Sequence, residues 1–148
     1  MILIDANLLL YAYVPESDHH RRARAWLEGT FSEREPVGLA WVVILAFLRI
    51  GTNPRVFRHP FSLREAGSIV SEWLAQPAVK ILQAEERHWT ILSELLPAAQ
   101  AASELVMDAH LAALAIEHGA TLCTNDRDFT RFPGLRVQYP LDAEVMQP

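Results

Sequence analysis

The sequence predicts an α/β domain in which helices cover both faces of a short, mainly parallel sheet. Short apolar runs alternate with longer helical patterns along the chain, and such alternation is typical of parallel sheets. The 148 residues and the hydrophobic fraction of 51% suit a single domain over residues 1–148 with a sizeable core. No apolar stretch approaches the roughly 20 residues that a membrane span needs, so no membrane association is expected.

Short apolar runs bounded by Gly, Pro or polar residues are the predicted strands. The first run is apolar until its last residue, Asp5. The strongly apolar stretch Val37–Thr52 is expected to hold a short strand or turn followed by a buried helix. Besides the one expected within Val37–Thr52, the predicted strands are Met1–Asp5, which is the first run, Val79–Leu82, Ala120–Thr124 and Arg136–Tyr139.

Capping residues and helix-ending Gly or Pro residues predict the helices. Ser62 and Glu65 fit a capping box, in which two side chains satisfy free backbone donors at a helix start. The predicted helices are Asp18–Glu28 ending near Gly29, the second part of Val37–Thr52, a helix from Ser62 towards Pro77, Ala84–Leu96 closed by Pro97, a helix from about Ser103 to Gly119, and a turn or short helix at Asn125–Arg131.

Aspartate is scarce, with six in the chain, and four of them fall where a parallel sheet places functional sites. Such sites form beyond the carboxyl ends of the strands. Asp5 ends the first predicted strand, Asp126 and Asp128 follow a later one, and Asp108 opens an alanine-rich helical stretch. Gathered carboxylates repel each other unless a hard divalent cation holds them. The pattern therefore predicts a divalent metal site.

Each aspartate also has a structural explanation. Asp5 could cap the short helix that follows it, and Asp108 could complement a helix dipole. Asp126 could form a turn, and Asp128 fits a turn role better than a ligand role. The two kinds of role are compatible, because a capping aspartate can still bind a metal ion.

The positive charge is almost entirely arginine, although the net charge is −5. Residues 49–64 contain Arg49, Arg55, Arg58 and Arg64 and no acid. Arginine forks fit phosphate oxygens, so this segment is a candidate RNA contact; the alternative is a solvated surface. The six histidines lack a metal-ligand spacing, and the single Cys123 excludes an intrachain disulfide. A cytoplasmic protein is expected.

Three segments together resemble the PIN-domain ribonucleases, and within them the VapC-type toxins of bacterial toxin–antitoxin pairs. They are IDANLLLYA from Ile4, LAFLRIGTNP from Leu45, and DAHLAALAIEHGATLCTNDRDF from Asp108. The resemblance implies a three-layer PIN-like fold and a Mg²⁺-dependent site, with Mn²⁺ as the other candidate, that cleaves a structured loop of tRNA or ribosomal RNA. It also implies a cytoplasmic setting and an antitoxin partner.

The acids of the family pattern fall on Asp5, Asp108 and Asp126. We expect Asp5 and Asp108 to bind metal directly and Asp126 to bind it directly or through water. Asp128 and Asn7 are expected around these ligands, where Asn7 could hold Asp5 or a bound water, or only form a local turn. The carboxylates would position the ion, and water that it activates would attack the RNA phosphate.

One position departs from the family pattern. The family has a glutamate in the helix after the first crossover, and the matching stretch here is Ala46-Phe47-Leu48. Phenylalanine cannot coordinate a hard cation, so we expect one ion to bind strongly and a second only with substrate. Glu104, one helical turn before Asp108, could compensate, or it could be a first-turn acid favoured by the helix dipole.

Two other functions compete with the ribonuclease prediction. A phosphotransferase with an aspartyl intermediate usually needs a second acid beside the nucleophile, and the segment here is Asp5-Ala6-Asn7. A non-catalytic module that binds RNA or protein is supported by Phe47. A homodimer is also expected, because apolar helix residues such as Trp41 and Phe47 are numerous enough to supply an interface.

Overall fold

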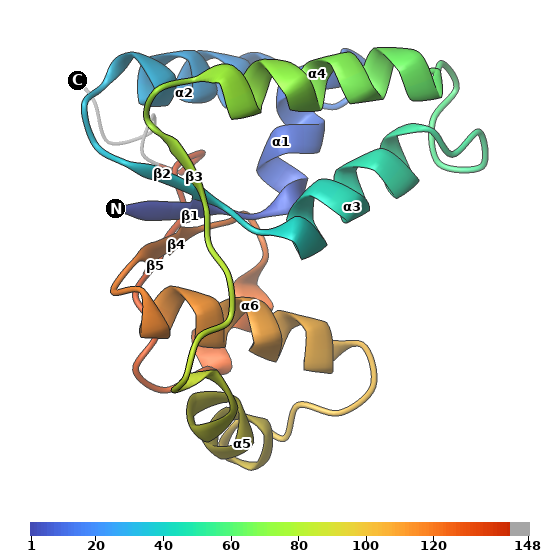
Figure 1. Cartoon of the computed structure of the whole chain (residues 1–148). Helices are drawn as coiled ribbons and strands as arrows, with labels where there is room; N and C mark the ends of the chain where they lie inside the picture. The colour runs from blue at the N-terminus through green and yellow to red at the C-terminus, as the bar shows by residue number, and fades with distance from the viewer. Residues whose placement is uncertain (143–148) are drawn as a thin grey trace.

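The computed structural model describes residues 1–142 and contains a five-stranded sheet between two layers of helices (Figure 1). All neighbouring strands pair in parallel, in the order β3-β2-β1-β4-β5. The strands are β1 Ile2–Ile4, β2 Val37–Leu39, β3 Val79–Ile81, β4 Thr121–Cys123 and β5 Val137–Gln138. The predicted α/β class is confirmed. The prediction of one domain reaches residue 148, and its last six residues lie outside the described part.

Helices α1 to α4 cover one face of the sheet, and α5 and α6 cover the other (Figure 1). Their bounds are α1 Ala6–Tyr13, α2 His20–Ser32, α3 Trp41–Gly51, α4 Leu63–Ala75, α5 His88–Ala98 and α6 Leu105–Glu117, and a 3₁₀ helix η1 spans Arg127–Arg131. None of the helices within residues 1–142 is long and apolar enough to cross a membrane.

The central strands are buried on both faces, which explains why their sequences are apolar without alternation. Leu3 and Ile4 of β1 and Leu122 of β4 have no exposed surface. Gly38 of β2 lies so close to Leu82 that an added Cβ would be 2.6 Å from its Cδ1 atom. A side chain at Gly38 would therefore disturb the packing behind the sheet.

Some helix boundaries differ from the predictions. Helix α5 runs through Pro97 and ends at Ala98, so Pro97 does not close it after Leu96 as predicted. Helix α2 passes through Gly29 and ends at Ser32; a Cβ at Gly29 would meet nothing within 4 Å, so this glycine only weakens the helix. Helix α5 begins at His88, not at Ala84. The carboxylate of Glu117 accepts hydrogen bonds from the backbone N–H groups of Glu85 and Arg87, at 2.9 Å each, and holds this segment as a tertiary cap.

Candidate acidic site

Asp5 lies at the carboxyl end of β1, where the chain turns into α1. Its Oδ1 accepts a hydrogen bond from the backbone N–H of Ala6 at 2.8 Å, so Asp5 does cap the helix. Its Oδ2 accepts hydrogen bonds from the Thr124 hydroxyl at 2.7 Å and the Asn7 amide at 3.3 Å. Burial raises the pKa of Asp5, and Asp126 adds to this, whereas the bonds from Thr124 and Ala6 oppose it; the net shift is upward.

Asp108 lies in the first turn of α6 and is half-buried. Its pKa is raised from 3.8 to about 6, first because burial disfavours the charged form, and then because the carboxylates of Asp126, Asp5 and Asp128 repel that charge. The Arg131 guanidinium opposes the shift. The four aspartates predicted from the sequence are therefore brought to one edge of the sheet.

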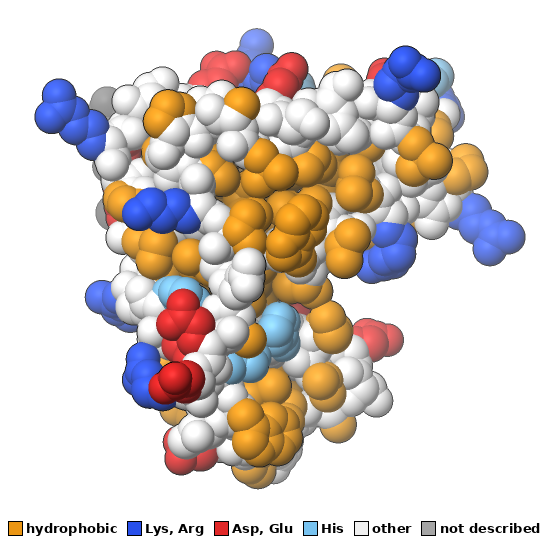
Figure 2. Space-filling model, in the orientation of Figure 1, with side chains coloured by type: hydrophobic (Ala, Val, Ile, Leu, Met, Phe, Trp, Pro, Cys, Tyr) orange, Lys and Arg blue, Asp and Glu red, His pale blue; other side chains and the backbone are white. Residues whose placement is uncertain are grey.

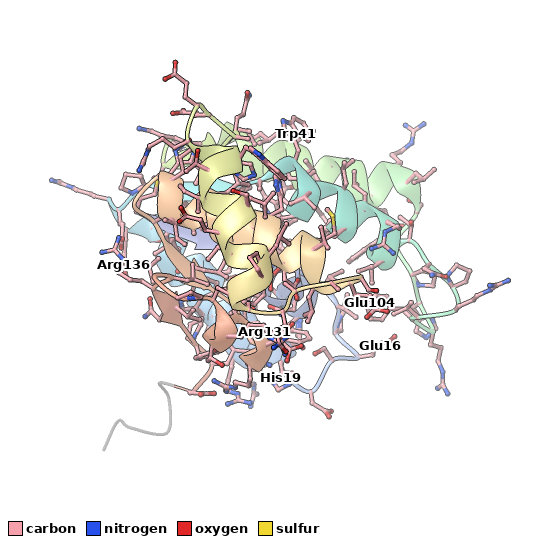
Figure 3. All side chains as sticks on the ribbon, turned by 90° about the horizontal axis from the view of Figure 1, so that it is seen from below. Glu16, His19, Trp41, Glu104, Arg131 and Arg136 are labelled. Atoms are coloured by element: carbon pink, nitrogen blue, oxygen red, sulfur yellow. The ribbon has the colours of Figure 1, made fainter. Side chains whose placement is uncertain are left out.

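Asp126 and Asp128 occupy the turn after β4. The Oδ1 of Asp126 caps η1 by accepting a hydrogen bond from the backbone N–H of Asp128 at 2.9 Å. The exposed Asp128 carboxylate lies 3.8 Å from the Arg131 guanidinium. Figure 3 shows Arg131 at η1, at the rim of this turn. Both aspartates thus have the predicted structural roles in the turn. Their negative charges also contribute to the raised pKa of Asp108.

Thr124 connects the acidic residues, and the sequence reasoning missed it. The residue is fully buried. Its Oγ1 donates to Asp5 and accepts hydrogen bonds from the Asn7 amide at 3.2 Å and the backbone N–H of Asp126 at 3.0 Å. The available signal was its position directly after β4, the strand that pairs with β1. Arg131 was missed as well, since the chain offers eleven other arginines.

An apolar groove of about 700 Å³ adjoins the carboxylates, between α3 and α6. Asp5, Asp108 and Arg49 contribute its charged groups, and Val42, Val43, Leu45, Ala46, Met107 and Leu111 are among its apolar lining. Figure 2 shows the hydrophobic side chains gathered over α3 and a notch between the upper and lower helical layers. Leu45 and Met107 of the lining are more than half exposed, at 58% and 53%. Trp41 at the start of α3 is 51% exposed.

A family model described as the PIN domain matches residues 2–135. The chain belongs to the PIN-domain family. It is 42% identical over 140 residues to Ribonuclease VapC37 of Mycobacterium tuberculosis, a match that covers 95% of this chain and 97% of that protein. It is 40% identical over 145 residues to VapC ribonuclease Mb2897 of Mycobacterium bovis, covering 98% and 99%. The predicted resemblance to VapC proteins is confirmed.

Solved structures share the PIN fold at lower identity. VapBC2 from Rickettsia felis, bound to a promoter DNA fragment, aligns with a TM-score of 0.68 and 19% identity over 93% of this chain and 98% of that one. FitAcB from Neisseria gonorrhoeae aligns with a TM-score of 0.63 and 22% identity over 95% and 98%. These two structures support the fold.

The PIN-domain structure corrects the interpretation of Phe47. Its side chain is fully buried and does not line the groove; it packs against Trp73 with ring centroids 4.6 Å apart and against Tyr13 and Phe61 at about 6 Å. The neighbouring Ala46 lines the groove together with Asp5 and Asp108. Phe47 therefore does not stand at the site, and the α3 position that faces the acids is alanine.

Glu104 precedes α6, is exposed, and forms no capping hydrogen bond (Figure 3). It is not among the charges that shift the pKa of Asp108, so the structure gives no support to its compensating role. Arg49 does line the groove beside Asp5. Arg55 and Arg58 are exposed on the loop between α3 and α4, away from the groove lining.

The donor set fits a hydrated divalent cation. Asp5, Asp108 and Asp126 offer only hard oxygen atoms. Burial and, after it, repulsion by the neighbouring carboxylates raise the pKa of Asp108, and a bound cation would relieve that repulsion. Among residues 1–142 no three His, Cys, Asp or Glu side chains converge on a fully assembled metal site. Mg²⁺ commonly uses only one or two carboxylates and completes its shell with water and phosphate, so both observations are compatible with it.

Proposed function

We propose that the protein is the toxin of a type II toxin–antitoxin pair and a Mg²⁺-dependent endoribonuclease, with Mn²⁺ as a second usable ion. The observation that carries this proposal is the gathering of Asp5, Asp108 and Asp126 at the carboxyl edge of the sheet, where Asp108 has a pKa of about 6. Relatives named ribonucleases, at 42% identity over nearly the full chain, support the same reaction. Structured RNA, tRNA or ribosomal RNA, is the proposed substrate.

Asp5 and Asp108 would hold the cation, and Asp126 would hold it directly or through water. When bound, the cation supplies an activated water and neutralises charge on the phosphate. Thr124 and Asn7 fix the orientation of the Asp5 carboxylate through bonds of 2.7 and 3.3 Å. Arg49, on the groove wall, would contact a non-bridging phosphate oxygen, and Arg55 and Arg58 would contact the RNA backbone further out.

The proposal includes a protein partner and a cytoplasmic setting, where the RNA substrate is found. An antitoxin segment with apolar side chains and a basic group would match the apolar groove and the acids beside it. A homodimer is also proposed. Trp41 and Leu45 are exposed and available to an interface, whereas the buried Phe47 is not.

The test is cleavage of total cellular RNA by the purified protein in Mg²⁺, in Mn²⁺ and in EDTA. We expect discrete fragments that require metal and that disappear in Asp108→Asn. In cells, Asp5→Asn is expected to abolish toxicity while the fold persists, which circular dichroism checks. A folded, antitoxin-free protein that cleaves no RNA at any metal concentration would support the non-catalytic binding module instead.

A further inference from the structure

Another hollow lies beside the acidic site, between α1 with the segment that follows it and the loop that connects α3 to α4. Its volume is about 450 Å³, and its lining includes Asn7, Tyr11, Glu16, Val56 and Phe57. We propose that this hollow, the Tyr11–Phe57 pocket, binds an unpaired nucleobase next to the RNA phosphate that is cleaved. The inference rests on the proposed ribonuclease function and adds a base-binding subsite to it.

Asn7 joins the pocket to the acidic site. Its amide nitrogen lies 3.3 Å from Oδ2 of Asp5 and 3.2 Å from Oγ1 of Thr124, and the same residue lines the pocket. The pocket therefore begins one side chain away from a proposed metal ligand. A nucleotide whose phosphate lies at Asp5 places its base, or that of its neighbour, within reach of this pocket.

The lining presents aromatic rings, which suit any nucleobase because every base has a π-face. Tyr11 is held in place: its ring lies 4.7 Å from the His19 ring, and its carbonyl oxygen lies 2.8 Å from Nδ1 of His20. Phe57 is half-buried in the facing loop, and its neighbour Val56 is 52% exposed. Glu16 and Ser17 add polar atoms that can meet a base edge.

The two walls of the pocket are tied together. Oε1 of Glu16 accepts a hydrogen bond from the backbone N–H of Arg58 at 3.0 Å, which joins the segment after α1 to the facing loop. Figure 3 shows Glu16 and His19 on this side of the molecule, on the opposite side of the view from Trp41. The pocket is thus separate from the exposed apolar residues of α3 and is shaped before any ligand arrives.

Charge favours RNA over a protein side chain as the occupant. Among the described lining residues Glu16 is the one acid, and its Oε1 accepts a hydrogen bond from the backbone N–H of Arg58. The facing loop exposes Arg55 and Arg58, and residues 49–64 contain no acid, so the loop side of the pocket attracts phosphate. In the described lining of the apolar groove between α3 and α6, Arg49 is the one basic residue. An apolar side chain of an antitoxin is the competing occupant.

The test measures stacking directly. A short single-stranded RNA of uridines with one internal 2-aminopurine is titrated with the protein in EDTA, where metal-dependent cleavage is stopped. Fluorescence quenching reports stacking of the base, and anisotropy of an end label reports affinity. We expect Phe57→Ala to lose the quenching and to weaken binding by about 5- to 150-fold, the range for loss of one base–aromatic stack.

Two further variants make the result decisive. Tyr11→Leu keeps a large apolar side chain, and it is expected to lose quenching even if Phe57→Ala proves unfolded by circular dichroism. Trp89→Ala is the matched control, because Trp89 is an aromatic residue with 68% exposure on α5, across the sheet from α1 (Figure 1). This control should quench like the wild type.

Unchanged quenching and affinity in both pocket variants would overturn the proposal. If these variants instead lose binding to the purified antitoxin while RNA binding persists, the pocket holds a protein side chain and the proposal also fails. The cleavage assay of the wild type is separate. A protein that cleaves RNA but shows no pocket-dependent quenching refutes the subsite and leaves the ribonuclease function standing.

Discussion

At the scale of single residues, the hydroxyl of Thr124 organises the acidic site, although it is not itself a proposed metal ligand. It connects Asp5, Asn7 and the backbone of Asp126, three parts of the chain that the sheet topology brings together. Thr124 cannot bind RNA, since it is fully buried. It is a positioning residue, and its contribution reaches the reaction through the orientation and pKa of Asp5.

Thr124→Val tests this role because valine keeps the shape and removes the hydroxyl. The change removes the Thr124 acceptor from the backbone N–H of Asp126 and one of the two acceptors of the Asn7 amide, which keeps Oδ2 of Asp5. We expect a cost of about 1–3 kcal/mol in the free energy of unfolding. It also removes a bond that lowers the pKa of Asp5, so metal affinity should fall. Urea unfolding and the Mg²⁺ dependence of cleavage measure the two effects.

Thr124→Ser is the matched control, since serine keeps the hydroxyl and loses only a methyl group. We expect its Mg²⁺ dependence to stay close to that of the wild type. Equal Mg²⁺ dependence in the valine and serine variants would show that Thr124 serves the fold alone.

The raised pKa of Asp108 predicts a pH-dependent stability in the metal-free protein. The pKa of the Asp108 carboxyl group is about 6 in the folded state, whereas its ordinary value is 3.8. Between these two pH values the folded state therefore binds more protons than the unfolded state. Stability from this group is therefore present below pH 3.8 and is lost as the pH rises to about 6. Asp108→Asn should remove this loss and raise the melting temperature at neutral pH in EDTA.

In Mg²⁺ we expect the wild type to have a higher melting temperature than Asp108→Asn, the reverse of the order in EDTA. Mg²⁺ stabilises the state that binds it, so the wild type gains more than Asp108→Asn. Thermal unfolding with Mg²⁺ and with EDTA, from acidic to neutral pH, measures the difference. A wild type that melts above Asp108→Asn in EDTA at neutral pH would contradict the raised pKa that burial and the neighbouring aspartates give Asp108.

At the scale of elements, the sequence predicts the strands and the edge where the aspartates gather, but not the rotation of α3. The run WVVILAFLRIG is apolar except for Arg49, so it has no continuous polar face that would indicate which residues point to the site. Family position suggested Phe47, whereas packing with Trp73 places Phe47 in the core and Ala46 at the groove. The contacts of Thr124 are equally hidden, because they join residues 117 and 119 positions apart.

A pair of glutamate substitutions tests the rotation of α3. Ala46→Glu adds a carboxylate beside Asp5 and Asp108, and we expect tighter Mg²⁺ binding with a fold that is retained in Mg²⁺. Phe47→Glu places a charge among aromatic rings and should cost more than about 3 kcal/mol of stability. Isothermal titration with Mg²⁺ and urea unfolding distinguish them. A folded Phe47→Glu protein with improved metal affinity would reverse the assignment.

At the scale of the whole molecule, the charge distribution restricts where RNA can bind. The net charge is −5 and acids surround the reaction centre, so attraction of a polyanion must be local. The loop between α3 and α4 can supply this local attraction, because it has exposed arginines and no acid. In the binding mode proposed above, an RNA strand along this loop would pass the Tyr11–Phe57 pocket before it reaches Asp5.

The salt dependence of RNA binding tests this path. If Arg55 and Arg58 each neutralise one phosphate, the slope of log K against log salt should become shallower by about 0.7 for each arginine replaced by glutamine. Arg34→Gln is the matched control: Arg34 is also exposed, but it lies just before β2, at the amino ends of the strands and so at the opposite edge of the sheet. Its slope should equal that of the wild type. An equal change in all three variants would mean that RNA senses only the net charge and follows no path along the loop.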